Sequence, residues 1–301
     1  MKRLLVSGLI NVETTLRIEA FPLPYFPVDY PFYGVASTVS GVGYNVAKAL
    51  TTLGHPVAFA SLIGRDTAAV QVRAALAADG VPGEFVLEAA HTAQSVIIYD
   101  RAGRRQIHAD LKDLQERAYP PDRFAQALAG CHLAVLCNIN FSRPFLAVAR
   151  QAGCLVATDV HAVASLDDDY NQDFMRAADV LFLSHERLPD TPEAVAREVL
   201  GRFGAQLVVI GLGGDGALLA VRRDGFVGRF PAVRARAIVN TIGAGDALFS
   251  AFLHGFVTTG DPYTALRRAQ VFAAYKIGTA GAAEGFLDAA GLERECARLD
   301  A

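Results

Sequence analysis

Short runs of apolar, β-prone residues recur along the chain, separated by alanine-rich stretches with helical spacing. The runs expected to be strands are Leu4–Val6, Val57–Ser61, Leu133–Cys137, Leu155–Asp159, Val180–Leu183 and Leu207–Ile210. Two of the expected helices cover Arg143–Ala152 and Pro192–Phe203. Continuous apolar strands separated by helices are typical of a parallel sheet covered on both faces. The pattern therefore predicts an α/β fold with a doubly wound, mostly parallel sheet.

Charge and composition limit the classes of partner. The 301 residues include 28 Lys and Arg against 31 Asp and Glu, a formal net charge of −3. Without a basic excess the chain lacks the charge that binds nucleic-acid phosphates, so we expect no nucleic acid partner. No run reaches about 18 uncharged apolar residues, so we expect no membrane partner. The four cysteines form no CxxC pair, which is typical of a reducing compartment and predicts a cytoplasmic protein.

Two segments depart from the alternating pattern. Residues 12–40 contain a cluster of prolines and aromatic residues, and residues 91–111 read as a hairpin. We expect them to form a small β-sheet lid, with residues 1–11, 41–90 and 112–301 forming the α/β body. The aromatic side chains are available to cover a ligand or a second subunit, which suggests a homodimer through the lid. An ordinary edge sheet with a few packed aromatic residues is the alternative.

The strongest motif lies in residues 239–252. A turn of small residues, Gly243, Ala244 and Gly245, leads into Asp246 and an amphipathic helix. Consecutive backbone N–H groups at a helix N-terminus suit a phosphoryl group, and Asp246 could accept a proton from an attacking hydroxyl. The alternative is a tight loop in which Asp246 only caps the helix.

Two further motifs lie near the expected carboxyl edge of the sheet, where ligands bind in doubly wound folds. Gly41, Gly43 and Asn45 open a second helix, and the sequence fits neither a dinucleotide fingerprint nor a Walker A loop. Glycines there would let a ligand approach the backbone, and Asn45 offers both donors and acceptors. Asn11 and Glu13, two residues apart after the first strand, could grip vicinal hydroxyls.

Together, and in this order, these segments resemble the ribokinase family of sugar kinases over essentially the whole chain. The resemblance implies a ribokinase-like fold with a β-sheet lid, ATP and Mg²⁺ as cofactors, and often a stimulating monovalent cation such as K⁺. It also implies that Asp246 is the catalytic base and that the amides of Gly243, Ala244 and Gly245 form an anion hole. Contacts to the sugar are implied for Asn11, Glu13, Gly41, Gly43 and Asn45.

The nucleotide loop of that family is similar to Gly211-Leu212-Gly213-Gly214-Asp215-Gly216, so Gly211, Gly213, Gly214 and Gly216 are expected to contact ATP. A glycine-rich turn without a ligand is the alternative. The chain departs from the family at Asn240 and Glu13, where Asp is usual, and at Ser40, where Gly is usual. Ser184 and Arg187 replace the family's Asn and Glu that order Mg²⁺. Glu186 lies one position away and could substitute for that Glu.

The expected substrate is a neutral sugar or nucleoside, phosphorylated on a primary hydroxyl. Kinases of phosphorylated sugars in this family need extra Lys or Arg near the substrate, and the two lid segments hold few: Arg17, Arg101, Arg104 and Arg105. Two alternatives stay open. One is a phosphosugar kinase of the phosphofructokinase type, and the other is a non-catalytic protein that binds a sugar or nucleoside and regulates a partner.

Overall fold

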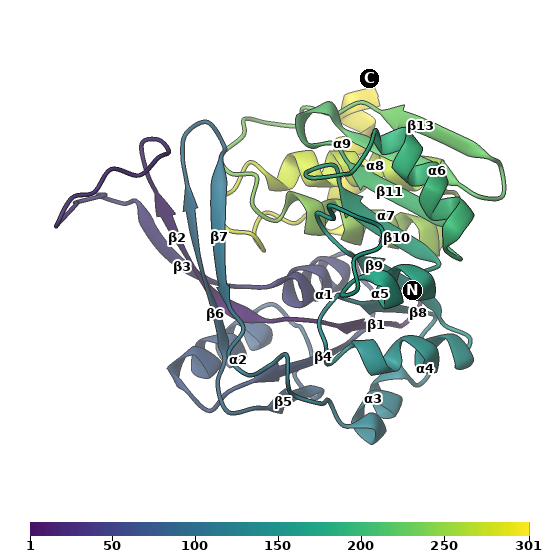
Figure 1. Cartoon of the computed structure of the whole chain (residues 1–301), viewed down its shortest axis with the longest axis horizontal. Helices are drawn as coiled ribbons and strands as arrows, with labels where there is room; N and C mark the ends of the chain where they lie inside the picture. The colour runs from purple at the N-terminus through teal and green to yellow at the C-terminus, as the bar shows by residue number, and fades with distance from the viewer. Residues whose placement is uncertain (301) are drawn as a thin grey trace.

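A nine-stranded, mostly parallel sheet runs through the molecule (Figure 1). The computed structural model describes residues 1–300. The strand order is β13-β12-β11-β10-β9-β8-β1-β4-β5, and only β12 and β13 pair antiparallel to their neighbours. The strands are β1 (Leu4–Ser7), β4 (Val57–Ile63), β5 (Val86–Glu88), β8 (Leu133–Leu136), β9 (Leu155–Asp159), β10 (Val180–Ser184), β11 (Leu207–Gly211), β12 (Ala217–Val221) and β13 (Phe226–Phe230).

Helices cover both faces of this sheet, because alternate apolar side chains of its central strands point to opposite sides. On β1, Leu4 and Val6 belong to one buried cluster and Leu5 to the other. The first cluster includes α1 (Val42–Thr52), α2 (Thr67–Ala78), α7 (Ala244–Thr259), α8 (Pro262–Lys276) and α9 (Ala289–Asp300). The second includes α3 (Pro121–Leu128), α4 (Leu146–Gln151), α5 (Gln172–Ala177) and α6 (Pro192–Arg202).

A second, four-stranded sheet stands beside the body (Figure 1). Its order is β3-β2-β6-β7, from β2 (Asn11–Arg17), β3 (Val35–Ser40), β6 (Ala93–Tyr99) and β7 (Arg105–Asp110). The outer strands are antiparallel to β2 and β6, which pair in parallel. On β6, Ile97 packs against Ile242 and Ala282 of the body, so the small sheet contacts the loop that precedes α7.

The predicted α/β class, with a mostly parallel sheet and a smaller sheet, is confirmed. Each predicted strand is present, with ends that differ by at most two residues. The expected helix from Arg143 begins as a single 3-10 turn and becomes α-helical only at Leu146. The division into body and lid segments stays a prediction. None of the helices within residues 1–300 is long and apolar enough to cross a membrane.

Candidate active site

Asp246 lies in the first turn of α7, and Asn45 of α1 holds it in place. The Asn45 side-chain amide donates a hydrogen bond of 2.6 Å to Oδ2 of Asp246, across 201 positions of sequence. The other carboxylate oxygen has no protein hydrogen bond among the described residues. The Asn45 contact fixes the carboxylate and leaves one oxygen available to a substrate hydroxyl.

The electrostatic surroundings of Asp246 make its carboxylate a stronger base than that of an ordinary aspartate. Burial raises the pKa of Asp246, while the Asn45 hydrogen bond and the positive charges of His161 and Lys276 lower it. The net direction is upward, toward neutral pH, where a general base works best. His161 is held at the end of β9, where Asp159 accepts from its backbone N–H at 2.8 Å. Although burial opposes it, the Asp159 carboxylate raises the pKa of His161 to about 9.

Backbone N–H groups are directed outward where α7 begins. Gly243 caps the helix with φ +75°, a left-handed conformation that favours glycine. Its Cα also lies so close to Ala282 that a Cβ atom would stand 2.4 Å from the Ala282 carbonyl oxygen. Among the described residues no acceptor takes the N–H groups of Gly243, Gly245 or Asp246, whereas Ala244 donates to the Thr241 carbonyl at 3.2 Å. Three neighbouring donors are therefore unoccupied at a helix N-terminus, an arrangement suited to an anion.

We call residues 240–245 the anion loop, and two buried side chains hold it. The Asn240 side-chain oxygen accepts from the Ile242 N–H at 2.8 Å. The Lys276 ammonium, at the end of α8, donates to the Ile242 carbonyl. The peptide groups on both sides of Ile242 are thus fixed by side chains rather than by a neighbouring strand. Sequence reasoning missed Lys276, although a single lysine in the apolar, alanine-rich stretch before Gly278 is an unusual feature.

Asn11 and Glu13 lie on β2 rather than at the exit of β1, and both are buried. Asn11 donates to Ser95 of the neighbouring strand at 2.9 Å. One side-chain oxygen of Asn11 and one of Glu13 are buried without a protein hydrogen-bond partner. Buried acceptors without donors are costly, so these two oxygens suit ligand hydroxyls.

Glu13 lies close enough to Asp246 for the two carboxylates to interact electrostatically. Burial raises the pKa of Glu13, the Ser40 hydroxyl lowers it, and the negative charge of Asp246 raises it further. Ser40 also lies 3.4 Å from the Asn45 side chain. The predicted residues from β2 and α1 are therefore brought together with Asp246.

Gly41 and Gly43 have a packing role in the structure. Gly41 adopts φ +104°, and a Cβ atom there would stand 2.7 Å from the Leu9 carbonyl oxygen. At Gly43 the added Cβ would stand 2.4 Å from the carbonyl carbon of Gly8. Close approach of α1 to the turn after β1 explains both glycines, and their contact with a ligand stays a prediction.

The expected nucleotide loop follows β11. Gly213 and Gly216 have φ of +60° and +100°, and Gly213 and Gly214 are exposed. The Gly211 carbonyl accepts hydrogen bonds of 2.9 Å from both the backbone N–H and ring Nδ1 of His185. This loop is thereby fixed to the segment after β10 and leaves exposed glycine backbone available to a ligand.

Glu186, the proposed metal ligand, lies in the same segment and faces the small sheet. Its carboxylate is 3.5 Å from the Arg105 guanidinium of β7, and its side chain is half exposed. Its backbone N–H donates to the Ser184 hydroxyl at 3.2 Å. No cluster of three or more acidic, His or Cys side chains suited to a metal occurs within the described part of the chain.

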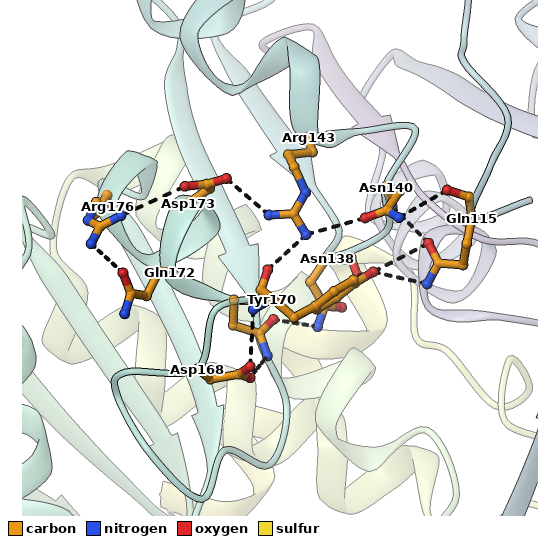
Figure 2. A network of polar contacts seen from close by, with 10 residues as sticks. Gln115, Asn138, Asn140, Arg143, Asp168, Tyr170, Gln172, Asp173 and Arg176 are labelled. Atoms are coloured by element: carbon orange, nitrogen blue, oxygen red, sulfur yellow. Dashed lines mark hydrogen bonds and ion pairs between the residues drawn. The ribbon is translucent and has the colours of Figure 1, made fainter.

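A polar network stabilises the loops at the carboxyl edge of β8 and β9 (Figure 2). The Tyr170 hydroxyl donates to the Asn138 carbonyl at 2.9 Å, and the Asn138 side chain donates to Asn171 at 3.0 Å. The Arg143 guanidinium stacks on the Tyr170 ring with 4.8 Å to its centroid. Gln115, after β7, joins the network through Tyr170 and Asn140. Side-chain contacts therefore connect the loops that follow β7, β8 and β9.

Comparisons with known proteins identify the family of this chain. Residues 1–289 match the pfkB family carbohydrate kinases. An acarbose 7(IV)-phosphotransferase from an Actinoplanes species is 30% identical, over 97% of this chain and 98% of its own. An ATP-dependent ribose-1-phosphate kinase from Halopiger xanaduensis is 28% identical, over 94% of each chain.

Solved structures show the same similarity. A microbiome-derived acarbose kinase has 29% identity and a TM-score of 0.87, with 99% of each chain covered. A ribokinase from Giardia lamblia has 15% identity and a TM-score of 0.84, also over 99% of each chain, and shows the fold alone.

Proposed function

Since this chain belongs to the pfkB family of carbohydrate kinases, we propose that it transfers the γ-phosphoryl group of ATP to a hydroxyl of a neutral sugar or nucleoside, with Asp246 as general base. The observation that carries the proposal is the placement of a carboxylate, held by Asn45, next to unoccupied N–H groups of the anion loop. A base and an anion site at one helix N-terminus are what in-line phosphoryl transfer requires.

The reaction needs one proton transfer and one exchange of bonds to phosphorus. Asp246 accepts the proton of the acceptor hydroxyl. The oxygen of that hydroxyl forms a bond to the γ-phosphorus, while the bond from the γ-phosphorus to the β-phosphate oxygen breaks and ADP leaves. The N–H groups of Gly243 and Gly245 stabilise the charge on the transferred group; Ala244 joins them only if its contact with Thr241 opens. Glu13 and Asn11 orient the acceptor through their unpartnered oxygens.

Cofactor binding follows from the same proposal. ATP binds along Gly211, Gly213, Gly214 and Gly216, and the glycines permit close approach of the nucleotide. Mg²⁺ keeps most of its waters when it binds phosphates, so a single carboxylate, Glu186, is a sufficient protein partner through water. When bound, the ion neutralises phosphate charge. Potassium stays an expectation from the resemblance to the ribokinase family.

A neutral acceptor is favoured because three of the four lid arginines already have carboxylate partners. Arg101 pairs with Glu19 at 3.1 Å, Arg104 pairs with the buried Asp100, and Arg105 faces Glu186. A phosphorylated sugar that bound one of these three arginines would have to displace its carboxylate. The similarity to two acarbose kinases supports a sugar without a phosphate group as the acceptor. The similarity to a ribose-1-phosphate kinase supports the alternative, in which the acceptor is a phosphorylated sugar.

We also propose a cytoplasmic homodimer that associates through the lid. The loop between β2 and β3 extends away from the body (Figure 1) and carries exposed aromatic side chains. Tyr25, Phe32 and Tyr33 are more than three-quarters exposed, and a partner copy would remove their rings from water. The test is the mass of the purified protein in solution, compared with that of a Phe32→Ser, Tyr33→Ser variant.

The decisive test of function is ATP consumption with Mg²⁺ in the presence of acarbose, fructose, ribose, inosine or ribose 1-phosphate. We expect turnover with a neutral acceptor, and a loss of about 10² to 10⁴-fold in Asp246→Asn, the range for a general base. Asp261→Asn is the matched control, because Asp261 caps α8 through the Tyr263 N–H at 2.9 Å and Asn caps equally well. Turnover only with ribose 1-phosphate would establish the phosphosugar alternative, and ligand binding without any turnover would establish the regulatory one.

A further inference from the structure

Lys276 is a fully buried lysine, which is rare unless the charge is paired. It is the last residue of α8, and its ammonium donates to the carbonyl oxygen of Ile242 in the anion loop. Within residues 1–299, for which side chains are described, no carboxylate forms an ion pair with it and no second acceptor receives its remaining N–H groups. The position therefore holds a positive charge without a contact ion pair, which interacts with the carboxylates of Asp246, Glu13 and Glu284 only at longer range.

The single contact of this ammonium fixes the orientation of an amide in the anion loop. A trans peptide is planar, and its C=O and N–H point in opposite directions. Because the Ile242 carbonyl is drawn toward Lys276, the Gly243 N–H of the same peptide is directed away from Lys276. That N–H is one of the unoccupied donors at the start of α7. The Asn240 side chain holds the peptide before Ile242, because its oxygen accepts a hydrogen bond from the Ile242 N–H. The side chains of Asn240 and Lys276 therefore fix the orientation of the two peptide groups that flank Ile242.

The charge of Lys276 also reaches the reacting groups. It interacts electrostatically with Asp246 and Glu13, and it stabilises the ionised form of both carboxylates. The anion loop is also joined to the end of α8 by its backbone, because the Asn240 N–H donates to the carbonyl of Ile277 at 3.1 Å. The Lys276 ammonium and this backbone contact therefore hold the same loop.

We propose that the Lys276 ammonium is a built-in cation of the anion loop, which orients the Gly243 N–H toward the transferred phosphoryl group and makes an added monovalent cation unnecessary. The proposal rests on the proposed kinase function. Lys276 is a positioning residue, since it acts through the Ile242–Gly243 peptide rather than by contact with substrate. Water molecules would satisfy its two remaining donors.

The test compares Lys276→Met with the wild-type chain on the acceptor that the wild type phosphorylates from the panel above. Met keeps the shape and removes the charge, so we expect kcat to fall about 10- to 100-fold, as for a misplaced catalytic donor, with KM for the acceptor nearly unchanged. We expect only a small change in melting temperature, because removal of the desolvated charge offsets the loss of the donor to the Ile242 carbonyl. The control is Lys48→Met on α1, which breaks the 2.9 Å ion pair with Asp79 at the end of α2 and should keep wild-type turnover.

Chemical rescue separates a missing cation from a damaged fold. Lys276→Ala leaves a cavity beneath the Ile242 carbonyl, and ammonium or methylammonium ions should restore its kcat several-fold, while tetramethylammonium, which has no N–H, should not. Wild-type turnover should be the same with and without potassium chloride at constant ionic strength.

The pH profile gives an independent readout. Burial lowers the pKa of Lys276 to about 8, against the opposing charges of Asp246, Glu13 and Glu284. The neighbouring Arg236, which donates to the carbonyl of Tyr275, adds another fixed cation. Wild-type kcat should therefore decline above about pH 8, and this alkaline limb should be missing in Lys276→Met.

The outcomes distinguish this inference from the function on which it rests. A wild-type chain that phosphorylates none of the acceptors refutes the proposed function and the inference with it. An active wild type beside an equally fast Lys276→Met refutes the role of the lysine alone, as does a wild type that needs potassium. Loss of activity together with a large fall in melting temperature, without rescue by ammonium ions, would show that Lys276 is structural.

Discussion

Replacing Gly243 by alanine tests whether the position of the anion loop sets the rate of phosphoryl transfer. The added Cβ would stand 2.4 Å from the Ala282 carbonyl oxygen, and contacts below 3.0 Å are essentially never seen, so the loop must retreat by about 0.6 Å. The left-handed φ of +75° adds roughly 1–2 kcal/mol of strain for a residue with a Cβ. Because a displacement of about 1 Å can cost about 100-fold in rate, we expect kcat to fall about 10- to 100-fold.

The same helix provides a matched control. Gly260 ends α7 with the same φ of +75°, but a Cβ there would meet nothing within 4 Å. Gly260→Ala should therefore lose only the roughly 1–2 kcal/mol of strain from its left-handed φ in urea unfolding and keep wild-type kcat in the ATP-consumption assay. The reasoning fails if Gly243→Ala turns over at the wild-type rate, or if Gly260→Ala is slowed as much as Gly243→Ala.

Two further predictions use buried ionisable groups. Glu13→Gln should raise KM for the substrate about 10-fold or more, because the charged carboxylate that accepts hydrogen bonds from substrate hydroxyls is lost. Burial raises the pKa of Glu13, so the KM of the wild type should also rise as pH falls. A KM that does not change with pH would contradict this prediction. His55 and His254 are buried, their rings hydrogen-bond at 3.0 Å, and burial lowers the pKa of His254 to about 4. Stability is therefore fully present above the unfolded pKa of about 6.5 and is lost as pH falls toward 4, by up to about 3 kcal/mol. Urea unfolding at pH 7 and 4.5 should show a smaller loss for His254→Gln, and an equal loss would refute the role of His254.

Much of the fold follows from local patterns, because buried parallel strands must be apolar throughout. The runs from Leu155 to Asp159 and from Val180 onward show this directly, and both lie where expected. β12 and β13 were not predicted. β13 includes Gly228 and Arg229 and has no apolar run, so only its pairing with β12 defines it.

The motif residues were predicted to share a site, and Asn45 and Asp246 do so by direct contact. Local sequence patterns cannot explain why a particular residue type occurs at a position when the cause is a contact with a residue far away in the sequence. Gly43 is explained by the backbone of Gly8, and Lys276 by the carbonyl of Ile242. Spacing along the sequence contains no information on either contact, because each depends on how α1 and α8 pack on the sheet.

The hydrogen bond between Asn45 and Asp246 has a consequence for synthesis of the protein. Its partners are separated by 201 positions, and Lys276 lies still further along the chain. During translation the α1 segment leaves the ribosome long before the residue it must hold, so the site cannot assemble on a partial chain. Phosphoryl transfer should therefore begin only after α8 has joined the body. A chain interrupted before residue 276 should not bind either substrate productively and should not consume ATP.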